Sequence, residues 1–291
     1  MNLKEKILSL SGIMTKKQSQ LARYVVGNIR EVALMNSTQL AFSAKVSEST
    51  ITRFVYMIGY KNFSEFQLDL RKEAQGPVRV PSLQIQKNED DRNEPAYKTV
   101  YDLEMCLMTE AFLQIDPAVF DSMVDVLCSA KKLLLIGNPT HTFLSQYAYN
   151  FMSLFRDDVY NITSIDLPFT SLLRKLNNES AALVFSYPRY PKETLNIVKT
   201  LNAKKVQILG VTDSSFSPIV PFCKYYLTTP QKYLILGEAN AAVVAMIHSL
   251  FLGMYRKNTE AIKDNLKEYE ENILSLDMFA LKDYNFAKKL K

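Results

Sequence analysis

The chain has few of the residues that build disulfide frameworks and metal sites. Its 291 residues include only three cysteines, Cys106, Cys128 and Cys223, and two histidines, His141 and His248. The scattered, odd-numbered thiols exclude a disulfide framework and indicate a reducing compartment, and so few cysteines and histidines argue against a zinc centre. We therefore expect no metal and no other cofactor, and no catalytic residue is predicted.

The sequence also lacks a secretory signal and a clear membrane span. Mixed charges interrupt the first residues, and residues 234–254, which are apolar over nearly the length of a span, contain Glu238, Asn240 and His248. A buried helix or a subunit interface is the better interpretation of that stretch. With 47% hydrophobic residues the chain can form two domain cores, so we expect a globular cytoplasmic protein that does not bind membranes.

Positive charge is concentrated at the N-terminus. Residues 1–76 contain eleven Lys or Arg and six Asp or Glu, whereas the rest of the chain contains 35 − 11 = 24 basic and 30 − 6 = 24 acidic residues. The first 76 residues therefore carry the whole formal net charge of +5. This distribution favours a partner with a phosphate backbone.

Residues 37–66 have the pattern of two short helices joined by a tight turn. Ser37 or Thr38 is a candidate N-cap for the first helix, and Val46 fills the corner between the two helices. Ser47 then caps a second helix over residues 48–58, which Gly59 ends. Caps, turn and glycine stop follow the order of a helix-turn-helix motif, which indicates a DNA-binding protein.

The second of these helices is the predicted recognition helix, the one that enters the major groove. Ile51, Val55 and Ile58 recur at helical intervals and are expected to pack inward. The other faces carry hydroxyls and an arginine, which bond phosphates and base edges, although such residues can also form an ordinary solvated surface. The predicted DNA-contacting residues are Thr38, Lys45, Ser47, Ser49, Thr50, Thr52, Arg53, Tyr56 and Lys61.

The rest of the chain alternates helical segments with short apolar runs. Residues 77–95, rich in proline and charge, are expected to link a domain at 1–76 to one at 96–291. A helical stretch from Tyr97 to Ala130 is expected to break where Asp116 caps a new helix at Pro117. The fold class is thus an all-α domain followed by an α/β domain with a doubly wound parallel sheet. Its predicted strands are 133–137, 159–163, 181–186, 206–212 and 225–228.

Ligands of such sheets bind beyond the carboxyl ends of the strands. Loops at 137–142, 186–194 and 212–218 lie there and place hydroxyls near helix N-termini, whose free amides can hold a phosphate. We expect His141 to be a loop residue rather than a catalytic base. Glu238, near the start of a helix predicted over 236–256, is expected to be a first-turn acid that complements the helix dipole.

Two family resemblances accompany these patterns. Residues 1–76, above all LA-x-x-A-x-VS-x-STI-x-RF followed by GY-x-x-F-x-EF, resemble the N-terminal domain of the RpiR family of bacterial sugar-metabolism regulators. Residues from about 105 to 256 resemble a sugar-isomerase-type (SIS) domain, most visibly in VFSYPRYPKET and GVTDSSFSP. Together the resemblances imply an operator-binding domain followed by a domain that binds a phosphorylated sugar.

The phosphate loops depart from the SIS pattern. That family has G-x-G-x-S after the first strand and S-x-S-G-x-T after the third, whereas here Pro139 replaces the second glycine and Pro188, Arg189 and Pro191 replace Ser, Gly and Thr. Without these hydroxyls the domain would have no sugar-phosphate site, or Arg189 and Lys192 would bind a phosphate or carboxylate in their place. Both possibilities stay open. The predicted effector-binding residues are Asn138, Thr140, His141, Thr142, Ser186, Arg189, Lys192, Thr194 and Glu238.

The sequence thus predicts a ligand-controlled transcription regulator. We expect it to bind double-stranded operator DNA as a homodimer, with assembly to a tetramer left open, and to sense a sugar phosphate or related anionic metabolite. One alternative is the same regulator with a SIS domain used for dimerisation alone. Another is a sugar-phosphate isomerase, which needs an acid and a base beside the sugar carbons, for which only His141 and Glu238 are candidates.

Overall fold

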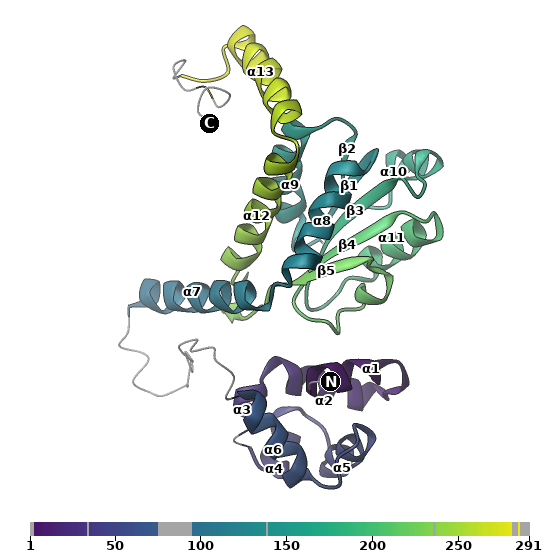
Figure 1. The fold of residues 1–291 in the computed structure, drawn as a ribbon, viewed down its shortest axis with the longest axis vertical. Helices are drawn as coiled ribbons and strands as arrows, with labels where there is room; N and C mark the ends of the chain where they lie inside the picture. Colours follow the sequence, from purple (N-terminus) through teal and green to yellow (C-terminus); the bar gives the residue numbers. More distant parts are fainter. Residues whose placement is uncertain are drawn as a thin grey trace. The chain divides into compact units, whose positions relative to one another are not determined.

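The computed structural model describes residues 3–33, 35–74, 95–137, 139–234, 237–280 and 285. The chain divides into two compact units, a helical N-terminal unit and a unit built around a parallel sheet (Figure 1). The predicted linker at 77–95 lies outside the described residues except for Pro95, which directly precedes a helix.

The N-terminal unit is a bundle of short helices around one apolar core. Ile7, Leu21, Leu40, Phe54 and Phe66 are fully buried, and each comes from a different helix. Burial of these side chains, rather than the propensity of such short segments, stabilises the helices. The helices are α1 (Leu3–Ser9), η1 (Ser11–Ile13), α2 (Lys16–Gly27), α3 (Ile29–Val32), α4 (Ser37–Ser43), α5 (Glu48–Met57) and α6 (Phe63–Ala74).

The caps of α4 and α5 show which local predictions were right. The prediction that Ser37 or Thr38 caps α4 is wrong, because both are already helical and Asn36 accepts the Gln39 amide at 2.8 Å while the Gln39 side chain accepts the Asn36 amide at 2.9 Å. This reciprocal capping box fixes the helix start one residue earlier. Ser47 is confirmed as the cap of α5, and Gly59, with φ of 92°, follows its end.

The second unit contains five parallel strands in the order β2-β1-β3-β4-β5, which confirms the predicted sheet. Asp116 caps α8 and Pro117 is its first residue, as predicted. The elements are α7 (Ala96–Gln114), α8 (Pro117–Ser129), β1 (Lys132–Gly137), α9 (Thr142–Phe155), β2 (Val159–Ile162), α10 (Leu167–Leu172), η3 (Leu173–Lys175), β3 (Ser180–Ser186), α11 (Lys192–Ala203), β4 (Gln207–Thr212), η4 (Val220–Phe222), β5 (Tyr225–Thr228), β6 (Tyr233–Leu234), β7 (Gly237–Glu238), α12 (Ala241–Lys257) and α13 (Thr259–Leu276).

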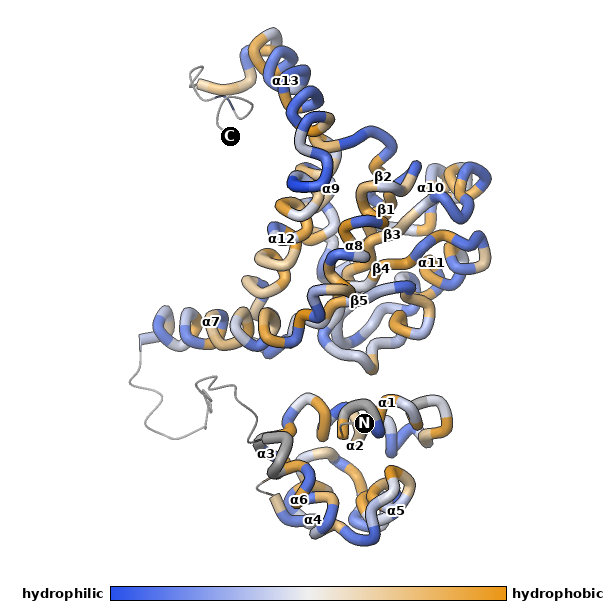
Figure 2. Tube along the Cα trace, viewed as in Figure 1, coloured by the Kyte–Doolittle hydropathy of each residue, from blue (hydrophilic) through white to orange (hydrophobic). Residues whose placement is uncertain are grey.

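Helices cover both faces of the sheet, as expected of a doubly wound fold. Helices α8, α9 and α12 lie on one face of the sheet, and α10 and α11 lie on the other (Figure 1). Leu133 and Leu135 of β1 pack in the core of the first face, whereas Leu134 and Ile136 pack in the core of the second. Because both faces are buried, the middle residues of the central strands are apolar, and they are drawn toward the hydrophobic colour in Figure 2.

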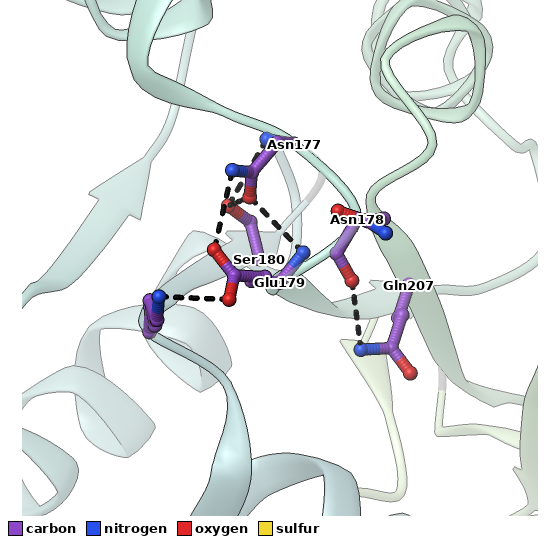
Figure 3. Close-up of polar contacts among 6 residues, drawn as sticks. Asn177, Asn178, Glu179, Ser180 and Gln207 are labelled. Carbon is purple, nitrogen blue, oxygen red and sulfur yellow. Dashed lines mark hydrogen bonds and ion pairs between the residues drawn. The ribbon is translucent and has the colours of Figure 1, made fainter.

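The amino ends of the strands are held by a polar turn before β3. The Asn177 side chain accepts the Glu179 amide at 3.0 Å, and Gln207 Nε2 donates to the Asn178 carbonyl at 3.2 Å (Figure 3). An ion pair of 2.7 Å between Lys131 and Glu179 joins the same turn to the start of β1. These contacts satisfy the polar groups of the turn at the edge opposite the strands' carboxyl ends.

One predicted helix begins later than expected. Residues 233–238 contribute the short antiparallel strands β6 and β7, so α12 begins at Ala241 rather than near 236. Glu238 therefore lies in β7 and is not a first-turn acid of the helix, which corrects that expectation. Among the described helices, none combines the length and apolarity needed to cross a membrane.

Candidate functional site

Helix α5 presents a polar stripe to solvent. Ile51, Phe54 and Val55 are buried against the bundle, and Ile58 follows them into the core. Four of the predicted DNA-contacting residues, Ser49, Thr52, Arg53 and Tyr56, are exposed along the opposite side of the helix. Their spacing places them on one accessible stripe, as a recognition helix requires.

The hydroxyls at the start of α5 are partly engaged within the helix. Ser47 Oγ accepts the Thr50 amide at 3.3 Å and lies 2.9 Å from both Ser49 Oγ and Thr50 Oγ1. Thr52 Oγ1 donates to the Glu48 carbonyl at 3.2 Å. Ser47 thus has a structural role as a cap, whereas Arg53 and Tyr56 are the long exposed side chains of the stripe.

The turn between α4 and α5 is held by helix α2. Lys45 adopts a left-handed conformation with φ of 53°, and its carbonyl accepts from Lys17 Nζ at 3.3 Å. Gln20 Nε2 donates to the neighbouring Ala44 carbonyl at 2.8 Å. Sequence analysis missed Lys17 and Gln20, because no local pattern shows that α2 meets this turn. The remaining predicted contacts, Thr38, Lys45 and Lys61, are exposed.

The carboxyl edge of the sheet has its switch point at β1, which lies between β2 and β3. The loops after β1 and β3 therefore lead in opposite directions, and α/β folds typically bind ligands beyond this point of the sheet. Gly137 ends β1, and a Cβ atom there would lie 2.5 Å from the His141 carbonyl oxygen and 2.8 Å from Ser145 Oγ. Only glycine permits this approach, which packs His141 against the strand end.

His141 and Glu238 form a buried pair at this edge. The imidazole is fully buried, its Nε2 contacts Glu238 Oε2, and its Nδ1 lies 3.0 Å from Thr140 Oγ1. Burial lowers the pKa of His141, and the neighbouring Glu238 carboxylate only partly offsets this effect. The lowered pKa of His141 favours the neutral imidazole near pH 7. His141 lies in the loop before α9, as expected, and its ring is buried in contact with Glu238.

Aromatic side chains enclose this pair. The Tyr187 ring lies 4.9 Å from the His141 ring, centroid to centroid, and its hydroxyl is 2.6 Å from Thr229 Oγ1. Burial raises the pKa of Tyr187, which keeps the phenol protonated. Tyr187 and Thr229 were not among the predicted site residues, although both follow strand ends.

Two further tyrosines connect carboxylates to the same edge. Tyr190 donates to Asp213 at 2.7 Å. Burial and the negative charge of Glu238 raise the pKa of Tyr233, and the charge of Arg189 opposes this rise. Tyr190, Asp213 and Tyr233 were also missed as site residues. The hairpin that carries Tyr233 interrupts a stretch whose apolar character suggested a helix.

Arg189 occupies the position at which the SIS pattern S-x-S-G-x-T has glycine. Its φ is 74°, and that of Tyr190 is 31°, so the loop keeps a backbone conformation that glycine favours. A side chain in this region costs about 1–2 kcal/mol. The backbone at Arg189, whose side chain is exposed, therefore adopts its conformation at a free-energy cost.

The other predicted effector residues are distributed around the edge. Ser186 is buried, and its carbonyl accepts a hydrogen bond from Thr212 Oγ1. Thr194 is buried in the first turn of α11, whereas Lys192 is exposed at the start of that helix. Thr140 is exposed, Thr142 Oγ1 donates to the Pro139 carbonyl at 3.3 Å, and Asn138 lies outside the described residues. In the described ranges no group of three His, Cys, Asp or Glu side chains could hold a metal ion.

The fold and these surfaces define a class: a helix-turn-helix unit joined to an α/β unit with sugar-isomerase topology. Residues 1–77 match the model of the rpiR-family helix-turn-helix domain, and residues 126–254 match that of the SIS domain. The chain belongs to the RpiR family of helix-turn-helix transcriptional regulators. It is accordingly a DNA-binding regulator with a SIS domain.

Similar proteins share this architecture. HexR of Escherichia coli, an HTH-type transcriptional regulator, is 23% identical over 296 residues, which cover 100% of this chain and 98% of HexR. The NanR protein of Vibrio vulnificus, solved with ManNAc-6P, covers 96% of this chain and 100% of its own with 18% identity and a TM-score of 0.56. The sugar isomerase domain of an RpiR factor from Sphaerobacter thermophilus covers 61% of this chain and 99% of its own, with 16% identity and a TM-score of 0.58.

Proposed function

We propose that a sugar phosphate or a related anionic metabolite binds at the carboxyl edge of the sheet and controls DNA binding by this regulator. The observation that carries the proposal is the buried His141–Glu238 pair at the switch point of the sheet. A buried titratable pair at the site where α/β folds bind ligands is more typical of a binding site than of a surface used only for packing.

The chemistry around the pair suits a sugar derivative. Glu238 and Asp213 supply carboxylate oxygens that accept hydrogen bonds from sugar hydroxyls, and the tyrosine rings offer apolar faces. Arg189 and Lys192 are exposed on the loop and helix after β3. Their guanidinium and ammonium groups can bind a phosphate in place of the Ser and Thr hydroxyls that the two prolines of the loop replace. NanR, of similar fold, was solved with ManNAc-6P, a ligand of this class.

The exposed stripe of α5 is the proposed contact with operator DNA. Arg53 and Tyr56 reach base edges in this proposal, while Lys45, Lys61 and Thr38 contact phosphates.

An exposed apolar row on α7 supports a homodimer, because a helix face of this kind is typical of a subunit interface. A two-fold dimer would read a pseudo-palindrome with half-sites spaced by a multiple of about 10 base pairs. The row consists of Tyr97, Tyr101, Met105, Met108 and Phe112.

Thermal unfolding with a ligand panel tests the effector proposal. The panel contains ManNAc-6P, glucose 6-phosphate, fructose 6-phosphate and, as a control for simple anion binding, inorganic phosphate. A ligand that binds the folded state raises the melting temperature, and Arg189→Ala and Glu238→Gln are expected to reduce that rise. The Arg174→Ala variant, which removes an exposed arginine of η3, serves as the matched control.

The same panel separates the alternatives. If no sugar phosphate raises the melting temperature while the protein is dimeric, the SIS domain serves dimerisation alone. If chromatography of the panel after incubation reveals an isomerised sugar, the domain is an enzyme. The named relatives of similar length are transcriptional regulators, which favours the regulatory function.

A further inference from the structure

We propose that Glu104 of α7 is a positioning residue that connects the first helix of the sheet-bearing unit to the Glu238–His141 pair. Its carboxylate bonds two consecutive backbone amides at the start of α12: Oε1 accepts from Asn240 N at 3.0 Å, and Oε2 accepts from Ala241 N at 3.0 Å. Both oxygens of one side chain are thus used on a helix that is distant in the sequence.

This contact replaces a cap that α12 does not provide for itself. Asn240 is the N-cap residue, yet its side chain makes no capping hydrogen bond and instead donates from Nδ2 to the Glu238 carbonyl at 2.8 Å. The first amides of a helix need acceptors, and a negative charge is favourable at the positive end of the helix dipole. Glu104 supplies both from another element.

The capped segment is the one that carries the site. Glu238 lies two residues before Asn240, and its backbone carbonyl and side chain are fixed by Asn240 and by His141, respectively. Ala239, between them, is fully buried in a small apolar cluster that joins α7 to the start of α12. The cluster consists of Leu103, Leu107, Ala111, Ala239 and Ala242.

Helix α7, which carries Glu104, follows the DNA-binding unit in the sequence. Helix α7 is the first described element after residue 94, so the polypeptide from the DNA-binding unit enters the sheet-bearing unit through it. A ligand that displaces Glu238 would move the start of α12, and with it the Glu104 contact and α7. This regulatory meaning rests on the proposed effector site, whereas the positioning role of Glu104 does not. A ligand shifts the equilibrium only if it favours one position of α7 over another.

The titration of His141 tests the positioning role without any ligand. Only two histidines occur in the chain, so NMR resolves the ring signals of His141 and His248 as site and internal control. In Glu104→Ala, the start of α12 loses its cap, so Glu238 is held less closely to His141. The Glu238 carboxylate then raises the pKa of His141 less, while burial still lowers it. We expect the apparent pKa of His141 to be lower in Glu104→Ala than in the wild type.

Matched variants make the outcome decisive. Glu110→Ala removes a carboxylate from the same helix and is expected to leave His141 unchanged, because Glu110 accepts from Gln114 in its own helix. Glu104→Gln keeps an acceptor oxygen and is expected to have a smaller effect, and it replaces Glu104→Ala if that variant does not fold. A His141 curve equal to wild type in a folded Glu104 variant overturns the proposal.

A second arm tests the regulatory part. Hydrogen exchange of the α7 amides is measured with and without ManNAc-6P in the full-length protein. Exchange that changes in wild type and not in Glu104→Ala supports the coupling, and exchange that changes equally in both overturns it. If ManNAc-6P does not bind, the effector proposal fails for that ligand, and the His141 titration still decides the role of Glu104.

Discussion

The Nε2 atom of His141 contacts Oε2 of Glu238, although one residue lies in the loop after β1 and the other in the strand β7 that precedes α12. Both side chains are largely removed from water, so each depends on the other for its hydrogen bonds. Removing one partner so that a buried polar group is left unsatisfied typically costs about 1–3 kcal/mol. The pair therefore fixes the geometry of the edge more strongly than an exposed pair would.

Stability is expected to decrease in mild acid because of His141. In the unfolded chain this imidazole takes up a proton near its ordinary pKa of 6.5, whereas in the folded protein its pKa is lower. The unfolded state thus binds more protons between these two values, so the free energy of unfolding falls as the pH drops below about 6.5 and is unaffected by His141 above it. Melting temperatures across this range should fall less steeply in His141→Gln. His248→Gln is the control, and identical slopes in wild type and His141→Gln would contradict the expectation.

Arg53→Ala is expected to weaken specific operator binding by about 1–3 kcal/mol, because a base-edge contact of an arginine has this value. The operator is first obtained by selecting bound fragments of genomic DNA, and affinity is then measured by band shift at fixed salt concentration. Arg174→Ala removes the same charge from the other unit and should retain affinity. A titration in which Arg53→Ala binds as tightly as wild type would remove Arg53 from the contact set.

Ser47→Ala and Ser49→Ala are expected to have different effects. The first removes the N-cap of α5 and should lower the free energy of unfolding of the helical unit by about 0.5–2 kcal/mol. The second removes an exposed hydroxyl that does not cap the helix, so stability should stay within about 0.5 kcal/mol of wild type. Denaturant titrations followed by circular dichroism measure both. Equal losses of stability would show that the cap is not supplied by Ser47 alone.

Arg189→Gly and Arg189→Ala separate the backbone of the loop from its charge. Glycine accommodates φ of 74° without strain, so Arg189→Gly should be as stable as wild type or more stable by about 1 kcal/mol. Arg189→Ala keeps the strain and should show no such gain. Both variants lose the guanidinium and should bind a sugar phosphate equally weakly. A ligand-induced melting shift equal to wild type in both would show that Arg189 does not hold the anion.

The local features of the fold could be predicted from the sequence. Ser47, Gly59 and Asp116 act through neighbours within a few residues, so their caps and stops are visible in the pattern. The central strands were visible because both faces of the sheet are buried there, which makes each of them a short apolar run. The N-cap of α4 was missed because Asn36, Ser37 and Thr38 are all suitable cap residues, and the Gln39 side chain selects the first.

The site depends on contacts that no local pattern contains. The sequence placed His141 and Glu238 in the right region but not in contact, because their pairing requires the hairpin of β6 and β7, which the apolar stretch hid. Glu104 meets α12 across more than half of the unit's sequence, so nothing near it indicated its partner. Arg189 was recognised as a replacement for glycine, while the left-handed backbone beneath it became visible only in the fold.

The positions of the two units and of the His141–Glu238 pair along the chain have a consequence for synthesis of the protein. The buried core residues of helices α1 to α6 all lie between Leu3 and Leu70, so this core can form while the ribosome is still translating the remainder. The imidazole of His141, by contrast, waits for a carboxylate that emerges almost one hundred residues later. A nascent chain halted between the two would therefore contain a finished helix-turn-helix and a His141 without its partner. Under the proposed function it would engage DNA without being able to respond to a metabolite.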